Sequence, residues 1–426
     1  RQWRCDAHRG FHGPLHRAAL ERALRALVAR HESLRTQFRR VDGEARQVIG
    51  DGTAFSVDYQ DWEAREWGAS LETAIAQSVV DLVFDLERGP LLYVRLVRRH
   101  ATQHVLGLVL HHIVADAWSV GVLLRELGML YAAYCTDAAI QLDPLPIQYR
   151  DFAVWQEQWR QSERLNEAAA YWQAQLSGTL PQLSLPTDHQ RPERKQFAGE
   201  RLVHHLAGDT HQRLVSLAQG EGATDFHLLL ASVQAFLHRY TRDRDLIVGT
   251  TSAGRNRGEL QGQIGFYVNV LPVRQIFSPG ITFQQLLREV SENYRQAIAH
   301  EDYPFGQLLE TLAIETPPNR NPLFDVLVEM LGRELDEGQH AGLHELEIAP
   351  LDYEATVSKF DLAFRFLEDA EGLHIVLEYD RSLYAPWRMR ALLDNYIFYL
   401  QQVLHQAQAP LAELPVLTAV EADRVL

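Results

Sequence analysis

The chain has 426 residues, of which 46% are hydrophobic and 23% charged, and its net charge of -15 opposes a general nucleic-acid or anionic-membrane surface. Its apolar runs are shorter than the roughly 18 residues of a membrane span, and no secretory signal segment stands at the start. The two cysteines, Cys5 and Cys135, fit neither a disulfide framework nor a zinc cluster, so we expect a cytoplasmic protein. The length predicts two or three domains.

Helices and strands alternate in the first ~175 residues, because stretches with apolar residues at helical spacing are mixed with short apolar runs. The predicted elements, in chain order, are a helix over Pro14–Arg30, a hairpin that turns at Asp42–Gly43, a helix over Leu71–Phe84, strands over 90–99 and 104–110, and a helix over Val120–Tyr134.

A stretch rich in Pro, Ser, Thr and charge, residues 176–200, then interrupts the periodicity and predicts a linker. The second half mixes types again. Helices are predicted over 224–240, 283–300 and 386–406, and strands over 245–251, 264–274, 324–331, 360–369 and 372–380. We therefore expect two α/β lobes, residues 1–178 and 201–410, joined by a linker over 179–200.

The pattern His-His-x-x-x-Asp occurs twice, as HHIVAD (His111–Asp116) and as HHLAGD (His204–Asp209). The first follows VLGLVL, an apolar run typical of a strand buried on both faces. Adjacent residues of a strand point to opposite faces, so at most one of the two histidines is expected to move a proton while the other anchors the loop. The second match predicts only a strand end and a helix capped by Asp209.

A metal site is an alternative for the first match, since imidazole and carboxylate are ordinary zinc ligands. Such a site needs further ligands from elsewhere in the chain. The remaining histidines form no obvious second cluster in the sequence. We therefore expect no metal.

The motif HHIVADAWS resembles the core motif of condensation domains of non-ribosomal peptide synthetases. Five further stretches are similar to motifs of this family and follow in its order, so the resemblance covers essentially the whole chain. These are RHESLRTQF (Arg30–Phe38), YRDFAVWQ (Tyr149–Gln156), IGFYVNVLPVR (Ile264–Arg274), HEDYPFGQLLE (His300–Glu310) and NRNPLFDV (Asn319–Val326).

The opening motif of the family is absent, and residues 411–426 resemble the segment that leads into an adenylation domain. By this resemblance the chain is expected to be a domain, incomplete at its N-terminus, of a longer enzyme. The implied fold is α/β, with two chloramphenicol-acetyltransferase-like lobes in a V-shaped pseudo-dimer and an active-site tunnel between them.

The implied activity is peptide-bond formation. An upstream carrier domain brings the acyl or peptidyl thioester, and a downstream carrier domain brings the aminoacyl group whose amine attacks it. The phosphopantetheine arms belong to these carriers, so no directly bound cofactor is expected. An adjacent adenylation domain is a further implied partner, and the excised domain is expected to be monomeric.

The family match assigns His112 to the tunnel, as a general base or as a hydrogen-bond acceptor that positions the amine. His111 is expected to be structural. Asp116 is expected to form a structural salt bridge with Arg274, because a buried carboxylate needs a cation. Direct orientation of an imidazole by Asp116 is the alternative.

Six further residues are expected at the substrate or pantetheine tunnel: Arg35, Ala117, Trp118, Ser119, Asn269 and Asn321. Ala117 stands where most family members have Gly, which opens the question of whether a positive φ is needed there. Other roles remain open for three of them: core packing for Trp118, a helix cap for Ser119 and an exposed strand position for Arg35.

The motif is most similar to the subtype that joins an L-configured donor to an L-configured acceptor, and a starter domain with a fatty-acyl donor remains open. Two other functions are kept. One is an acyltransferase that uses CoA or other small thioesters, and the other is a non-catalytic docking domain of the same fold.

Overall fold

The computed structural model describes residues 4–62, 82–139, 142–331, 345–350, 357–369, 372–418 and 421–422. The chain divides into two compact units. Unit 1 takes its described residues from 1–161, 253–268 and 333–353, and unit 2 from 162–252, 269–332 and 354–426. The units therefore differ from two contiguous lobes, because the segment Ala253–Val268, here called the inserted segment, belongs to unit 1.

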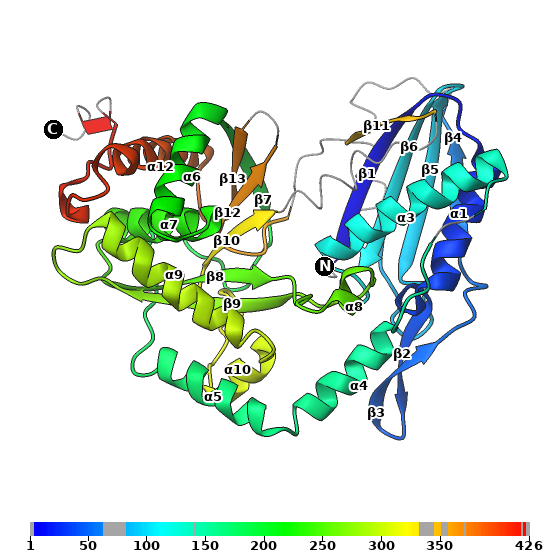
Figure 1. Ribbon diagram of the computed structural model, residues 1–426, viewed down its shortest axis with the longest axis horizontal. Helices are drawn as coiled ribbons and strands as arrows, with labels where there is room; N and C mark the ends of the chain where they lie inside the picture. Colours follow the sequence, from blue (N-terminus) through cyan, green and yellow to red (C-terminus); the bar gives the residue numbers. More distant parts are fainter. Residues whose placement is uncertain are drawn as a thin grey trace. The chain divides into compact units, whose positions relative to one another are not determined.

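Unit 1 is built on a five-stranded sheet of order β11-β1-β6-β5-β4, in which only β4 and β5 pair in parallel, with a separate β2-β3 hairpin. Figure 1 shows α1 and α3 lying across one face of this sheet. The elements of unit 1 are β1 (Arg4–His12), α1 (Arg17–Arg30), η1 (Glu32–Arg35), β2 (Thr36–Val41), β3 (Glu44–Ile49), β4 (Val57–Asp61), β5 (Leu92–His100), β6 (Gln103–His111), α3 (Ala117–Thr136), α4 (Tyr149–Trp159), α8 (Gly258–Gln261) and β11 (Glu347–Pro350).

The core of unit 1 lies between the sheet and these two helices. Helix α1 buries Leu20, Leu24 and Leu27, which recur at helical spacing, against α3 and the strands. The predicted hairpin is confirmed, with Asp42 at φ +53° and Gly43 at φ +84°, as its two-residue turn requires. Most of the predicted helix 71–84 lies outside the described residues.

Unit 2 is built on a six-stranded mixed sheet of order β7-β13-β12-β10-β8-β9, in which β10 pairs in parallel with both neighbours. Its elements are α5 (Glu163–Gln175), β7 (Gly199–Ala207), α6 (Gly208–Gly220), α7 (Asp225–Thr241), β8 (Asp245–Ser252), β9 (Asn269–Ile276), α9 (Phe283–Ala299), α10 (Phe305–Thr311), β10 (Val326–Leu331), β12 (Leu362–Glu368), β13 (Gly372–Asp380), α12 (Pro386–Gln406) and η2 (Leu411–Glu413). Helices α6, α7, α9 and α12 share one apolar core with its strands (Figure 1).

The predicted strand 264–274 is wrong in its first half, because β9 begins only at Asn269. Residues 264–268 belong to the inserted segment, where Ile264 is buried in the core of unit 1. The Tyr267 N–H donates to the Asp116 carboxylate rather than to a neighbouring strand. The helices of the described residues include none with an apolar stretch sufficient for a membrane span.

Candidate active site

The loop between β6 and α3 begins where a fully buried strand ends. Seven consecutive residues of β6, from His104 to Leu110, are buried, and His111 is the last residue of the strand. His112 therefore lies in the turn, where strand alternation no longer fixes its direction. This placement explains how two adjacent histidines take different surroundings.

The His111 ring anchors the loop. Its Nδ1 accepts a hydrogen bond of 3.1 Å from the Ile113 N–H, and its edge packs against Phe84 with ring centroids 5.8 Å apart. Because Nδ1 is an acceptor, the ring is neutral with its proton on Nε2. Burial lowers the pKa of His111, which favours the same neutral form.

The His112 ring instead meets the inserted segment. It contacts Phe266 edge-on, with ring centroids 5.0 Å apart and the planes at 90°. His112 is only half-buried, and Phe266 is 40% exposed. Of the two histidines, His112 is thus the one whose position depends on the inserted segment.

The Asp116 carboxylate is a buried acceptor for several donors. It caps α3 by accepting from the Ser119 N–H at 2.8 Å, and it accepts from the Ser119 hydroxyl at 2.6 Å. Its other oxygen accepts from the Tyr267 N–H at 3.0 Å. Asp116 therefore joins the start of α3 to the inserted segment, and it is not placed to act as a proton carrier.

The cation beside Asp116 is Arg255, and the predicted pairing with Arg274 is wrong. The Arg255 guanidinium lies 3.0 Å from the Asp116 carboxylate, with the two side chains 1% and 4% exposed. Arg274 lies in unit 2, where it pairs with Asp245 at 2.7 Å. Arg274 lies on β9, in the sheet of unit 2, whereas the inserted segment places Arg255 in unit 1.

Arg255 also organises its own segment. One terminal nitrogen donates to the carbonyl groups of Leu260 and Gln263, at 2.6 and 2.7 Å. The other donates to the Ser119 hydroxyl at 2.9 Å, and the guanidinium lies 4.2 Å from the centroid of the Tyr267 ring. We call Asp116, Ser119, Arg255 and Tyr267 the Asp116 cluster. A buried ion pair with this many hydrogen bonds holds its partners in one geometry.

The three residues that follow Asp116 in the motif differ in their surroundings. Ser119 does not cap α3, because Asp116 is the cap, but its hydroxyl oxygen accepts from the Gly265 N–H at 3.1 Å. The Trp118 indole donates to the Gln261 carbonyl at 2.9 Å and so packs on the inserted segment. Ala117 is the exposed first residue of α3, outside the positive-φ residues, so a methyl group there causes no backbone strain.

Tyr149, the first residue of the motif YRDFAVWQ, contacts the inserted segment. Its hydroxyl donates to the Phe266 carbonyl at 2.9 Å, and its ring packs edge-on against Tyr267 with centroids 5.1 Å apart. Gly265 lies directly under this ring, where an added Cβ would stand 2.2 Å from a Tyr149 ring carbon. The inserted segment needs a glycine at this position for that reason.

Replacing Gly265 by alanine is expected to destabilise the packing of the inserted segment by about 1–3 kcal/mol, the cost of overpacking. Urea unfolding measures this change. The matched control is Gly258→Ala in the same segment, where an added Cβ meets nothing within 4 Å. Equal stability of the two variants would contradict the close contact between Gly265 and Tyr149.

The remaining predicted site residues form their hydrogen bonds within their own units, Arg35 in unit 1 and Asn269 and Asn321 in unit 2. Arg35 donates to the Gly50 carbonyl at 2.6 Å and lies near the end of α1. In unit 2, the Asn269 amide donates to the carbonyls of Glu301 and Tyr303, both at 2.7 Å. The Asn321 amide donates to the Lys359 carbonyl at 3.1 Å, beside a cavity of about 300 Å³.

Two interactions are not predicted from the sequence. The first is the pairing of Arg255 with Asp116, because Arg255 stands in the polar stretch AGRNRG, which is typical of an ordinary loop. The other is the buried contact of His31 and Arg30 with Glu126 of α3, at 2.7 and 3.1 Å. Although burial opposes ionisation, these two partners hold the pKa of Glu126 below its usual value. The motif RHESLRTQF therefore ties α1 to α3.

Comparison with known proteins agrees with the motif order. The condensation-domain family model matches residues 1–426. The chain is 38% identical to one of the linear gramicidin synthase proteins of Brevibacillus parabrevis over 97% of its length, but it spans only 8% of that relative. It is also 35% identical to tyrocidine synthase 3 of the same organism, again over 97% of its length and only 6% of the relative.

Solved structures agree as well. The X-domain from teicoplanin biosynthesis matches with a TM-score of 0.87 and 27% identity, over 98% of this chain and 94% of that one. The same X-domain is also known in a complex with OxyB. The four-domain nonribosomal peptide synthetase AB3403 has the same fold, with a TM-score of 0.87 and 21% identity, over 99% of this chain and 32% of that one.

The chain thus belongs to the condensation-domain family, whose members here are parts of non-ribosomal peptide synthetases. The expected α/β fold class is confirmed. Amide-bond formation, an acyl transfer, is the activity consistent with this membership.

Proposed function

We propose that this domain transfers an acyl or peptidyl group from a donor carrier domain to the amine of an aminoacyl group on an acceptor carrier domain. Both substrates arrive as thioesters on phosphopantetheine arms that belong to the carriers. An adenylation domain is a further proposed neighbour, since the curated relatives are far longer than this chain. The preference for an L-configured donor and acceptor stays a prediction.

The observation that carries the proposal is the way the loop 111–117 is held. His111 fixes its first turn through the Ile113 N–H, and the Asp116 cluster fixes its last residue and the start of α3. Between these points His112 is half-buried beside Phe266. A rigid frame around one half-buried imidazole suits a group that must meet a substrate in a defined position.

The proposed chemistry needs a group beside the attacking amine that accepts its proton or a hydrogen bond from it. The neutral amine attacks the thioester carbonyl, the carbon–sulfur bond breaks as the amide forms, and the amine proton reaches the leaving thiolate either through the His112 ring or directly. As a general base, His112 passes this proton to the leaving thiolate. As a positioning group, it accepts a hydrogen bond from the amine and raises the fraction of productive encounters.

Two rival functions make different demands. An acyltransferase that uses small thioesters needs no carrier protein. A docking domain needs no His112 chemistry at all, and the similarity to the X-domain, which forms a complex with OxyB, favours keeping this possibility. The intact HHIVAD motif and its rigid frame favour catalysis.

The deciding experiment loads one carrier domain with an acyl or aminoacyl donor and a second with an aminoacyl acceptor, adds this domain, and reads the acceptor carrier by intact-protein mass spectrometry. The proposal predicts that the acceptor gains the mass of the donor group. Equal product from CoA thioesters and free amines would support the small-thioester function. No product from any of several loaded pairs would support docking.

A further inference from the structure

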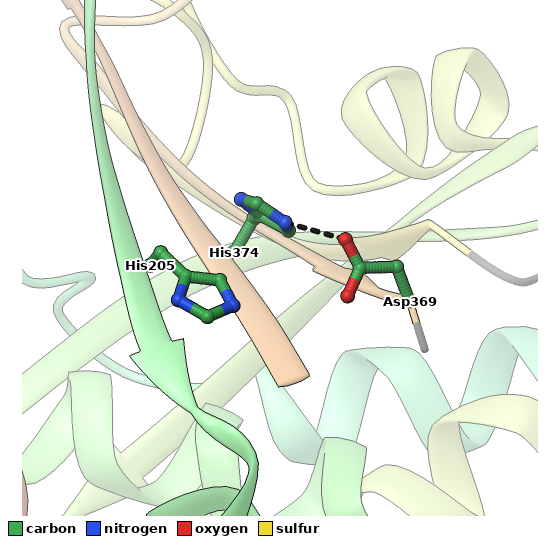
Figure 2. A group of neighbouring side chains, drawn as sticks. All are labelled: His205, Asp369 and His374. Carbon is green, nitrogen blue, oxygen red and sulfur yellow. Dashed lines mark hydrogen bonds and ion pairs between the residues drawn. The ribbon is translucent and has the colours of Figure 1, made fainter. Parts of the chain in front are cut away.

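The second His-His pair places one histidine beside two possible metal ligands in unit 2. His205 lies on the edge strand β7, directly opposite His374 on β13 in the antiparallel ladder. Asp369 directly follows the last residue of β12, and β13 pairs with β12 in the antiparallel sense. Figure 2 shows the three side chains gathered on one side of these strands.

Strand alternation explains why only one member of the pair takes part. On β7, Leu202, His204 and Leu206 share the face that packs on the core, whereas Val203 and His205 are exposed on the other face. Directly paired residues of an antiparallel ladder have neighbouring side chains on the same face. His374 is therefore the natural partner of His205, and their ring centroids are 4.8 Å apart.

Asp369 is oriented toward these rings by its hydrogen bonds. One carboxylate oxygen accepts from the Gly372 N–H at 3.0 Å, and the other lies 2.6 Å from His374 Nε2. One ligand atom from each of the three residues falls within 4.8 Å of the other two. His205 is exposed and His374 is 33% exposed, so an ion reaches both from solvent.

We propose that His205, His374 and Asp369 form a binding site for a late first-row divalent cation, with Zn²⁺ as the best match. Two imidazoles and one carboxylate are a common zinc ligand set, and they leave a fourth position for water. With metal–ligand bonds of about 2.0–2.1 Å, tetrahedral ligand atoms stand about 3.3 Å apart. To reach this spacing, the 2.6 Å contact between His374 and Asp369 would open and the exposed His205 ring would turn toward them. A set with two nitrogen ligands and one carboxylate does not suit Ca²⁺ or Mg²⁺.

The bound ion would link the edge strand β7 to the β12–β13 hairpin. Asp369 and His205 are 164 residues apart in the sequence, so the ion would close a long loop. Because the site exists only in folded unit 2, the ion would stabilise that folded form. This is a structural or regulatory site on unit 2, independent of the reaction proposed for His112.

Titration of the whole chain with ZnCl₂ tests the proposal, with calorimetry for stoichiometry and the absorption of Co²⁺ for tetrahedral geometry. We expect one site per chain, and a thermal midpoint that rises with the zinc concentration. His205→Ala and His374→Ala are each expected to raise the dissociation constant for Zn²⁺ by about tenfold or more. Loss of a residue that only hydrogen-bonds a metal ligand already has an effect of this size, and these two residues are proposed as ligands.

The matched control is His204→Ala, which removes the same residue type one position away on the opposite face of β7. Its dissociation constant for Zn²⁺ is expected to stay within about a factor of two of that of the unsubstituted chain, because His204 lies outside the proposed site. Absence of a one-to-one site, or equal loss of affinity in the His204 and His205 variants, would overturn the proposal.

Discussion

Replacing Arg255 by alanine is expected to lower the free energy of unfolding by about 3–5 kcal/mol, the cost of leaving a buried carboxylate without its cation. The Asp116 and Arg255 side chains are almost wholly inaccessible to solvent, so water cannot replace the lost partner. Urea unfolding gives the total change. Hydrogen exchange of the backbone near Tyr267, whose N–H donates to Asp116, is expected to accelerate first.

A double-mutant cycle distinguishes Arg255 from the arginine predicted by the sequence motif. Arg255→Ala combined with Asp116→Asn is expected to be strongly non-additive, because the two side chains share hydrogen bonds. Arg274→Ala combined with Asp116→Asn is expected to be additive within about 0.5 kcal/mol. Additivity in the first pair and coupling in the second would contradict the pairing described here.

Replacing His112 by alanine is expected to lower the rate of amide-bond formation by about 10²–10⁴-fold, the usual contribution of a group that handles a proton in the transition state. Its stability is expected to change little, because His112 is half-buried and its contact with Phe266 is partly exposed. Single-turnover transfer between loaded carriers measures the rate, and circular dichroism verifies the fold.

His204→Ala is the matched control for this variant, since it changes the first histidine of the second His-His-x-x-x-Asp match in unit 2. It is expected to transfer at the unsubstituted rate. His112→Gln separates the two roles, because an amide oxygen accepts a hydrogen bond but does not take a proton. Full activity of His112→Ala would refute both roles.

Periodicity and turn chemistry are sufficient to predict most of the individual elements. The hairpin at Asp42–Gly43 and the helix Pro386–Gln406 follow from local signals, namely a turn with two positive φ angles and a proline at the first helical position. The split strand at 264–274 is not predictable in this way. Its first residues are apolar because Ile264 packs in the core of unit 1, whereas β9 belongs to unit 2. An apolar run does not indicate which core it enters.

The sequence predicts several residues of the candidate site, but it does not predict which of them contact one another. The sequence motif identifies Asp116 as structural, yet a buried carboxylate indicates only that some cation is near. Arg255 and Arg274 both follow β8 in the chain, and only the course of the inserted segment decides between them. Likewise, HHLAGD predicts a helix capped by Asp209, but the residue at the cap position is Ala207. The proximity of His205 to His374 depends on strand register, which is a tertiary property.

The most direct test of the central claim, that the Asp116 cluster acts by holding the loop that presents His112, is a kinetic double-mutant cycle. Transfer rates are measured for His112→Ala, Asp116→Asn and the double variant, at a temperature where all three are folded. Residues that act as a unit are non-additive, so the double variant is predicted to be no slower than the slower single variant. Rate losses that multiply would contradict the account, because Asp116 would then contribute to catalysis independently of His112.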